Sequence, residues 1–235
     1  MNEMMNQSYS KAGFYSESLG RYTAKTFGWM FAGLLITFGV AFGMAITGAI
    51  FYVFTVPAWP YLLLAAELGV VIYLSARIEK MSVGMARAMF FVYSALNGVV
   101  FSAYFFLFDL LILGGVFLIT SLFFGIMALI GYFGNINFSA IRPFMMGGLI
   151  FLCLFWLLSI FINLSQFETT VCTVGIFIFL LFTAYDTKKI QAYYQHFGSA
   201  PELAQKASIF AALQLYLDFI NLFIYILRIV GNRKN

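Results

Sequence analysis

Seven long stretches of apolar residues dominate the chain, and each contains few or no charged side chains. They cover residues 26–54, 61–76, 85–108, 110–133 and 144–163, a sixth stretch from 170 to beyond 186, and 207–230. A helix of about 20 apolar residues crosses the hydrocarbon core of a bilayer. We therefore expect an all-α membrane protein, a bundle of seven transmembrane helices in contact with the lipid bilayer.

Composition leaves no room for a separate soluble domain. Only 9% of the 235 residues are charged and 63% are hydrophobic, whereas soluble domains carry about 25% charged residues. We expect a cytoplasmic N-terminal arm at 1–25, a membrane domain at 26–231 and a short tail at 232–235. The net charge of +4 is distributed over the loops, so a nucleic-acid partner is not expected. The arm lacks the features of a signal peptide.

Basic residues orient the predicted helices, because short loops rich in Lys and Arg stay on the cytoplasmic side. They occur in the arm and in the second, fourth and sixth loops, and they are Lys11, Arg21, Lys25, Arg77, Lys80, Arg87, Arg142, Lys188, Lys189 and Lys206. The N-terminus is therefore predicted inside. The lack of a targeting peptide and the compact size favour the cytoplasmic membrane of a bacterium, and an internal membrane of a eukaryote is the alternative. Arg228, Arg233 and Lys234 at the far end leave open a re-entrant last segment with an inside tail.

The seventh stretch carries one acid in its middle, Asp218, which is the only charge between Ala207 and Leu227. Steps of three and four place Asp218 on one helical stripe, and the other members of that stripe are Gln214, Asn221, Tyr225 and Arg228. A polar stripe is costly toward lipid and is expected to face the bundle interior or a water-filled cavity. We therefore predict that the last helix is central.

A second acid, Asp186, lies near the inner end of the sixth stretch. Two carboxylates held close in a low dielectric share a proton and titrate as a unit, so the pair is a candidate pH sensor and gate. Once deprotonated, the same oxygens are the ligands that Ca²⁺ prefers, which predicts a transient metal site. Alternatively, Asp218 belongs to a hydrogen-bond network or an Arg pair, and Asp186 is a solvated residue beside Lys188 and Lys189.

Two further charges fall within or beside the second stretch. Arg77 at its inner end is a candidate counter-charge that latches the acid pair, although an Arg at a membrane edge also simply extends toward water. Glu67 is a candidate cavity-lining residue together with Gln214, Asn221 and Tyr225 of the last stretch.

Cys153 and Cys172 lie in apolar runs without His, Asp or Glu at ligand spacing, so we interpret them as packing residues and expect no resident cofactor. His196, the only histidine, is interpreted as a surface residue of the sixth loop. Small residues spaced four apart indicate close helix packing. They are Gly39 and Gly43 in the first stretch and Ser94, Gly98 and Ser102 in the third.

Two segments resemble a known family. "AYDTKKIQ" at 184–191 and "LYLDFINLFIYILRIVG" at 215–231 are similar to the signature segments of the Bax inhibitor-1 (transmembrane BAX inhibitor motif) family, in particular its bacterial YccA/YetJ-like group. The resemblance implies a seven-helix bundle with a central last helix, and a pH-sensitive di-aspartyl pair at Asp186 and Asp218. It also implies an Arg on the second helix, best matched by Arg77. Lys188 and Lys189 replace residues among which Gln is common in the family.

The resemblance implies a pH-sensitive Ca²⁺ leak channel, with Ca²⁺ and protons as its ligands. The alternative is a membrane regulatory protein that binds and modulates a membrane-bound quality-control protease, with the arm at 11–25 as a docking element. An intramembrane aspartyl protease also places two acids on adjacent helices. Its second acid follows Gly-x-Gly, whereas Asp218 follows "LYL", so we do not expect an enzyme.

Overall fold

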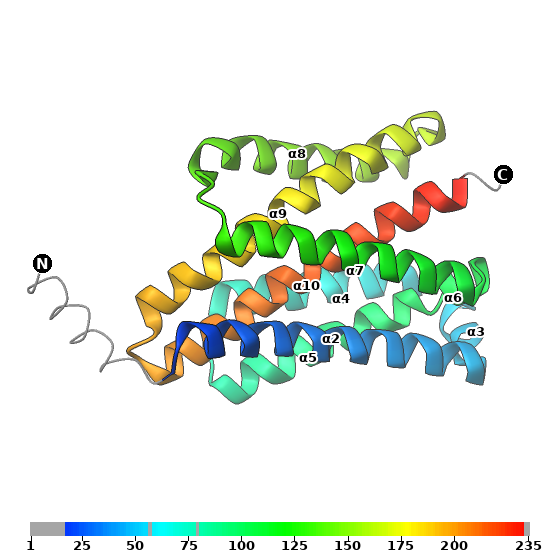
Figure 1. Cartoon of the computed structure of the whole chain (residues 1–235). Helices are drawn as coiled ribbons and strands as arrows, with labels where there is room; N and C mark the ends of the chain where they lie inside the picture. The colour runs from blue at the N-terminus through cyan, green and yellow to red at the C-terminus, as the bar shows by residue number, and fades with distance from the viewer. Residues whose placement is uncertain (1–16, 56–57, 79, 233–235) are drawn as a thin grey trace, which may run out of the picture. The chain divides into compact units, whose positions relative to one another are not determined.

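The computed structural model describes residues 17–55, 58–78 and 80–232, and within these ranges the chain is helical with no strand. The helices, shown in Figure 1, are α2 (Leu19–Thr47), α3 (Ala49–Phe54), α4 (Trp59–Arg77), α5 (Val83–Phe101), α6 (Tyr104–Leu107), α7 (Leu110–Phe133), α8 (Phe138–Ser159), α9 (Glu168–Phe197) and α10 (Pro201–Asn232), with a 3₁₀ turn at Ser165–Phe167. The all-α prediction is confirmed.

Six helical segments of the described chain are long and apolar enough to cross a membrane. They are Leu19–Thr47, Val83–Leu107, Leu110–Phe133, Phe138–Ser159, Ser165–Phe197 and Pro201–Gly231. Together with α4, which has 19 residues, they account for the seven predicted helices. The chain is a multi-pass membrane protein.

The first helix begins seven residues before the predicted stretch and ends before that stretch does. Ser18 caps it, because its side-chain oxygen accepts a hydrogen bond from the backbone N–H of Arg21 at 3.3 Å. Arg21 and Lys25 therefore lie on α2. Gly48, with φ of 69°, adopts the left-handed conformation that glycine tolerates and separates α2 from α3. Lys11, Arg233 and Lys234 lie outside the described residues.

The predicted fourth loop is shorter than expected, because α8 starts at Phe138 rather than at Phe144. The Asn137 side chain caps this start by accepting a hydrogen bond from the backbone N–H of Ser139 at 3.1 Å. Arg142 is consequently a helical residue, and Pro143 lies inside the helix.

The predicted sixth loop, which the sequence assigned to "YYQHFGSAPELAQK", is mostly helix. α9 continues to Phe197 and α10 begins at Pro201, so only residues 198–200 connect them. Proline suits the first position of a helix because a backbone N–H at that position has no hydrogen-bond partner within the helix, so proline loses nothing by lacking one. His196 and Lys206 of this stretch therefore lie on helices, as do Lys188 and Lys189, which were counted among the basic residues of the sixth loop. His196 is exposed, in agreement with its interpretation as a surface residue.

The last helix is continuous and is the most buried of the six. α10 has 32 residues, which is about 48 Å of helix and exceeds the roughly 30 Å hydrocarbon core. A re-entrant last segment needs a break in this helix, and the described chain has none between 201 and 232. In α10, 72% of the most apolar window is buried, against 11–39% in the other five segments. The prediction of a central last helix is confirmed.

The chain forms two compact units, and α9 and α10 each contribute to both. One unit contains residues up to Leu107 together with Lys189–Gln214, and the other contains Phe108–Lys188 and the residues from Leu215 onward. Below, they are called the first unit and the second unit.

In the first unit, α2 and α5 lie side by side (Figure 1) and approach closely at small residues. The Thr37 hydroxyl donates to the carbonyl oxygen of Ser94 at 2.8 Å, and a Cβ on Gly98 would lie 2.7 Å from the carbonyl oxygen of Thr37. The packing prediction is confirmed at Ser94 and Gly98. It is wrong for Gly39 and Gly43, because a Cβ at either position would meet no atom within 4 Å.

Candidate functional site

Asp186 on α9 and Asp218 on α10 are both buried in the second unit, with 6% and 4% of their surface exposed. Each interrupts an apolar helix at a point where the side chain faces protein and not lipid. Burying an ionised carboxylate is costly unless protein groups or a proton compensate its charge. Asp218 is therefore buried as predicted, and Asp186 is buried too, so the alternative that Asp186 is a solvated residue is wrong.

Contacts from α7 and α8 fix the segment of α9 that carries Asp186. Gly131 of α7 packs directly against the backbone of Ala184, where a Cβ on the glycine would lie 2.8 Å from the carbonyl carbon. The ring of Tyr185 meets the ring of Phe138 edge to face at 5.7 Å. On the same helix, the Thr187 hydroxyl is buried and donates to the carbonyl oxygen of Thr183 at 2.7 Å. Asp186 thus lies on a tightly packed segment.

The segment of α10 that carries Asp218 packs against α7. The ring of Phe219 lies 5.4 Å from that of Phe117 and 5.5 Å from that of Phe124, both in edge-to-face geometry. The Asn221 side-chain amide donates to the carbonyl oxygen of Leu217 at 2.7 Å. Helix α7 therefore contacts both acid-bearing helices within the second unit.

The two lysines that follow Asp186 make separate contacts. The Lys188 ammonium donates to the carbonyl oxygen of Gly134 at 3.2 Å, at the end of α7, where the helix dipole favours a cation. The Lys189 ammonium lies over the ring of Tyr193 at 5.6 Å from its centroid. Each of the two ammonium groups therefore contacts a partner of its own, which is a backbone carbonyl oxygen for Lys188 and an aromatic ring for Lys189.

The other predicted site residues divide between the two units. Asn221 and Tyr225 belong to the second unit with the acids, whereas Glu67, Arg77 and Gln214 belong to the first. Arg77 is the last residue of α4 and is exposed. Glu67 is half-buried, and its Oε1 has no hydrogen-bond partner among the described residues. The Gln214 Oε1 accepts a hydrogen bond from the Tyr193 hydroxyl at 3.4 Å.

The far end of α10 carries a polar cluster that the sequence reasoning missed. The Arg228 guanidinium forms an ion pair with Glu168 of α9 at 2.8 Å and lies over the ring of Trp156 of α8 at 4.1 Å. The Trp156 indole N–H donates to the Tyr225 hydroxyl at 3.1 Å. Tyr225 and Arg228 thus connect α10 to α8 and α9. The sequence feature that could have indicated this cluster is the position of Glu168 and Trp156 beside the same predicted outer loop.

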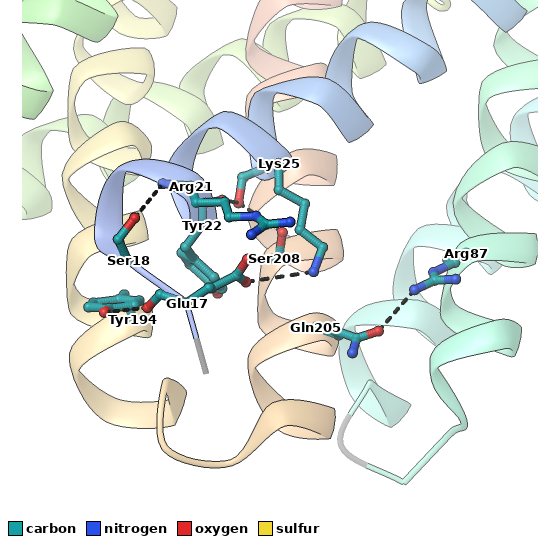
Figure 2. A network of polar contacts seen from close by, with 10 residues as sticks. Glu17, Ser18, Arg21, Tyr22, Lys25, Arg87, Tyr194, Gln205 and Ser208 are labelled. Atoms are coloured by element: carbon teal, nitrogen blue, oxygen red, sulfur yellow. Dashed lines mark hydrogen bonds and ion pairs between the residues drawn. The ribbon is translucent and has the colours of Figure 1, made fainter. Parts of the chain in front are cut away.

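A second polar network, in the first unit, fixes the beginning of α2 to α9 and α10 (Figure 2). The Tyr194 hydroxyl donates to the carbonyl oxygen of Glu17 at 2.7 Å. The Thr26 and Ser208 hydroxyls share a buried hydrogen bond at 2.9 Å, and the Lys25 ammonium lies 3.6 Å from the Glu17 carboxylate. The sequence reasoning singled out none of these contacts, because hydroxyl pairs leave no spacing pattern.

The described residues contain no group of three or more His, Cys, Asp or Glu side chains able to hold a metal ion. Ca²⁺ takes about six to eight oxygen ligands, more than two carboxylates supply. Asp186 and Asp218 alone therefore do not supply the ligands of a permanent Ca²⁺ site. Cys153 and Cys172 are free thiols, and Cys172 is buried as predicted for a packing residue, whereas Cys153 is exposed and does not pack in the protein interior.

Comparison with known proteins identifies the family of this chain. Residues 19–235 match the family described as "Inhibitor of apoptosis-promoting Bax1". The chain belongs to the Bax inhibitor-1 family. The matched span covers every helix described above and includes both Asp186 and Asp218.

Three bacterial proteins resemble this chain over nearly its whole length. The inner membrane protein YbhL of Escherichia coli K12 is 37% identical over 226 residues, which cover 92% of this chain and 93% of YbhL. An uncharacterized protein of Rickettsia prowazekii is 32% identical over 226 residues, 96% of this chain and 95% of its own length. A Deinococcus radiodurans protein is 33% identical over 212 residues, 90% of each chain.

Proposed function

We propose that this protein is a pH-sensitive Ca²⁺ leak channel of the bacterial inner membrane, with its N-terminus inside and with Asp186 and Asp218 as the gating pair. Membership of the Bax inhibitor-1 family supports the proposal, as does the similarity to a protein named for the inner membrane. The observation that carries it is the burial of both carboxylates in one unit, each on a long helix that contains an apolar stretch.

Protons and Ca²⁺ compete for the carboxylate oxygens in this mechanism. A shared proton lowers the negative charge of the pair, whereas its loss creates the hard oxygen ligands that Ca²⁺ prefers. Arg77 is the proposed counter-charge, so a change in the charge of the pair alters the balance between closed and open states. Asn221 and Tyr225, which belong to the same unit as the acids, are the proposed lining of the path.

Ca²⁺ flux into liposomes that contain the purified protein tests this function. Flux is measured between about pH 5 and pH 8 for the parent, Asp186→Asn and Asp218→Asn. Asparagine stays neutral over this range, so both variants are expected to lose the pH dependence of the flux. Asp109→Asn is the matched control because Asp109 is exposed at the start of α7. A flux from folded parent protein that equals the flux of empty liposomes would overturn the proposed channel function.

The second candidate function is regulation of a membrane-bound quality-control protease. The network in Figure 2 supports it, because α2 starts from a point held by Tyr194 and Ser208. The N-terminal arm is therefore attached to the protein at a fixed point, which suits a docking element. Deletion of residues 1–16 should then abolish co-purification of the protease while liposome flux stays unchanged. Neither function requires a catalytic group or a resident cofactor.

A further inference from the structure

The first unit contains a cavity of about 240 Å³ between the end of α4 and the α9–α10 hairpin. Its wall is mostly apolar and aromatic, with three polar side chains. The lining residues are Ser75, Ile78, Tyr193, Phe197, Leu203, Lys206, Ala207 and Phe210. None of the candidate gating residues lines this cavity, so it is a separate feature of the molecule.

A buried lysine lies in the cavity wall. The side chain of Lys206 is 9% exposed and forms an ion pair with Glu202 at 2.8 Å, whereas the Glu202 side chain is 68% exposed. Lysine is rarely buried to this degree without a compensating charge. An ion pair with so exposed a carboxylate is weak, so a phosphate in the cavity can compete with Glu202 for the ammonium through charge-assisted hydrogen bonds.

Basic side chains also occur beside the cavity. Arg77 lies between two lining residues on α4 and is exposed. Lys189 lies over the ring of Tyr193, which lines the cavity. The guanidinium of Arg87 donates to the side chain of Gln205, next to Lys206, at 2.9 Å (Figure 2). This distribution of charge favours an anionic ligand.

The size of the cavity and the helix surface beside it indicate an amphiphilic ligand. Pockets that enclose a whole small molecule usually have about 300 Å³ or more, so this cavity holds only part of a larger one. Ser75 at its wall shares a stripe of α4 with Ile72 and Leu68, at steps of three and four residues. Those two side chains are 64% and 54% exposed and offer an apolar path for a hydrocarbon chain.

We propose that this cavity binds the phosphate head group of an anionic phospholipid, with Lys206 as its main partner and an acyl chain along Ile72 and Leu68. Basic pockets between membrane helices are known to bind such head groups. The hydroxyls of Ser75 and Tyr193 line the same cavity and supply donors for the remaining phosphate oxygens.

The test is a lipid titration of the full chain in detergent, read by native mass spectrometry as lipid retained per protein. Phosphatidylglycerol is compared with neutral phosphatidylcholine and with soluble glycerol 3-phosphate. Lys206→Gln removes the charge, and Ala207→Phe fills the cavity while Lys206 stays. Lys80→Gln is the matched control, because Lys80 is an exposed lysine in the turn after α4. Gel filtration and circular dichroism establish that each variant is folded.

The parent and Lys80→Gln should retain one phosphatidylglycerol in preference to phosphatidylcholine. Lys206→Gln and Ala207→Phe should each weaken that retention by about tenfold, the scale of a lost charge-assisted contact. Equal retention of the two lipids, or parent-like binding by both cavity variants, would overturn the proposal. Glycerol 3-phosphate binding as tightly as phosphatidylglycerol would also overturn it, because the site would then recognise a soluble phosphate compound.

Discussion

Replacing Gly131 by alanine probes the approach between α7 and the helix that carries Asp186. The new Cβ would lie 2.8 Å from the carbonyl carbon and the Cα of Ala184, where ordinary contacts begin at 3.4 Å. The carbonyl oxygen of Ala184 would lie closer still, and because all of these atoms are backbone they cannot rotate away, so the helices must separate. Overpacking of this kind costs about 1–3 kcal/mol.

The matched control is Gly125→Ala on the same helix, because a Cβ there would meet no atom within 4 Å. Both substitutions gain about 1 kcal/mol of helix propensity, so the difference between them isolates the overpacking. For a chain of this length, 1 kcal/mol shifts Tm by about 2–4 °C, and Gly131→Ala should unfold about 2–12 °C below Gly125→Ala. Equal Tm values in thermal unfolding of the detergent-solubilised variants would refute the packing argument.

Two further predictions concern the polar contacts. A double-mutant cycle of Glu168→Gln and Arg228→Gln should give a coupling of about 1 kcal/mol in urea or thermal unfolding, because the pair is only partly exposed, and a coupling near zero would contradict it. Thr26→Val alone should destabilise by about 1–3 kcal/mol because it leaves the buried Ser208 hydroxyl without its partner, whereas Thr26→Val with Ser208→Ala should be nearly neutral. A double variant that is less stable than the single one would count against this account.

The helix bounds are predicted best from the sequence where a charged or small residue interrupts the apolar run at each end of the helix. The stretch at 110–133 matches α7 residue for residue, because Asp109 and Gly134 bound its apolar run. Hydropathy does not predict the end of a helix that continues beyond its apolar stretch, as α9 and α10 do, because the polar residues there still form helix. It also fails at Gly48, where a left-handed glycine interrupts an apolar run without any change in hydropathy.

For the candidate site, the burial of an acid was predictable from a single helix. An acid in an apolar stretch is expected to be buried, and Asp186 and Asp218 both are. Predictions that required knowledge of neighbouring helices were less successful. The spacing of Gly39 and Gly43 does not reveal which face of α2 meets a partner, and the two glycines face open space. The contact between Glu168 and Arg228 joins residues 60 positions apart, a separation for which the sequence holds no local signal.

The burial of α10 has a consequence for biogenesis. Ribosomes make this helix after the other described helices, and it is the one of the six long apolar segments that the rest of the protein covers most, at 72% of its most apolar window. Every nascent molecule therefore passes through a stage in which the earlier helices are in the membrane while the surfaces that α10 will cover are still open. Glu168 and Trp156 are already synthesised at that stage and await Arg228. Translation that stalls within α10 before residue 228 would therefore leave Glu168 without this ion-pair partner.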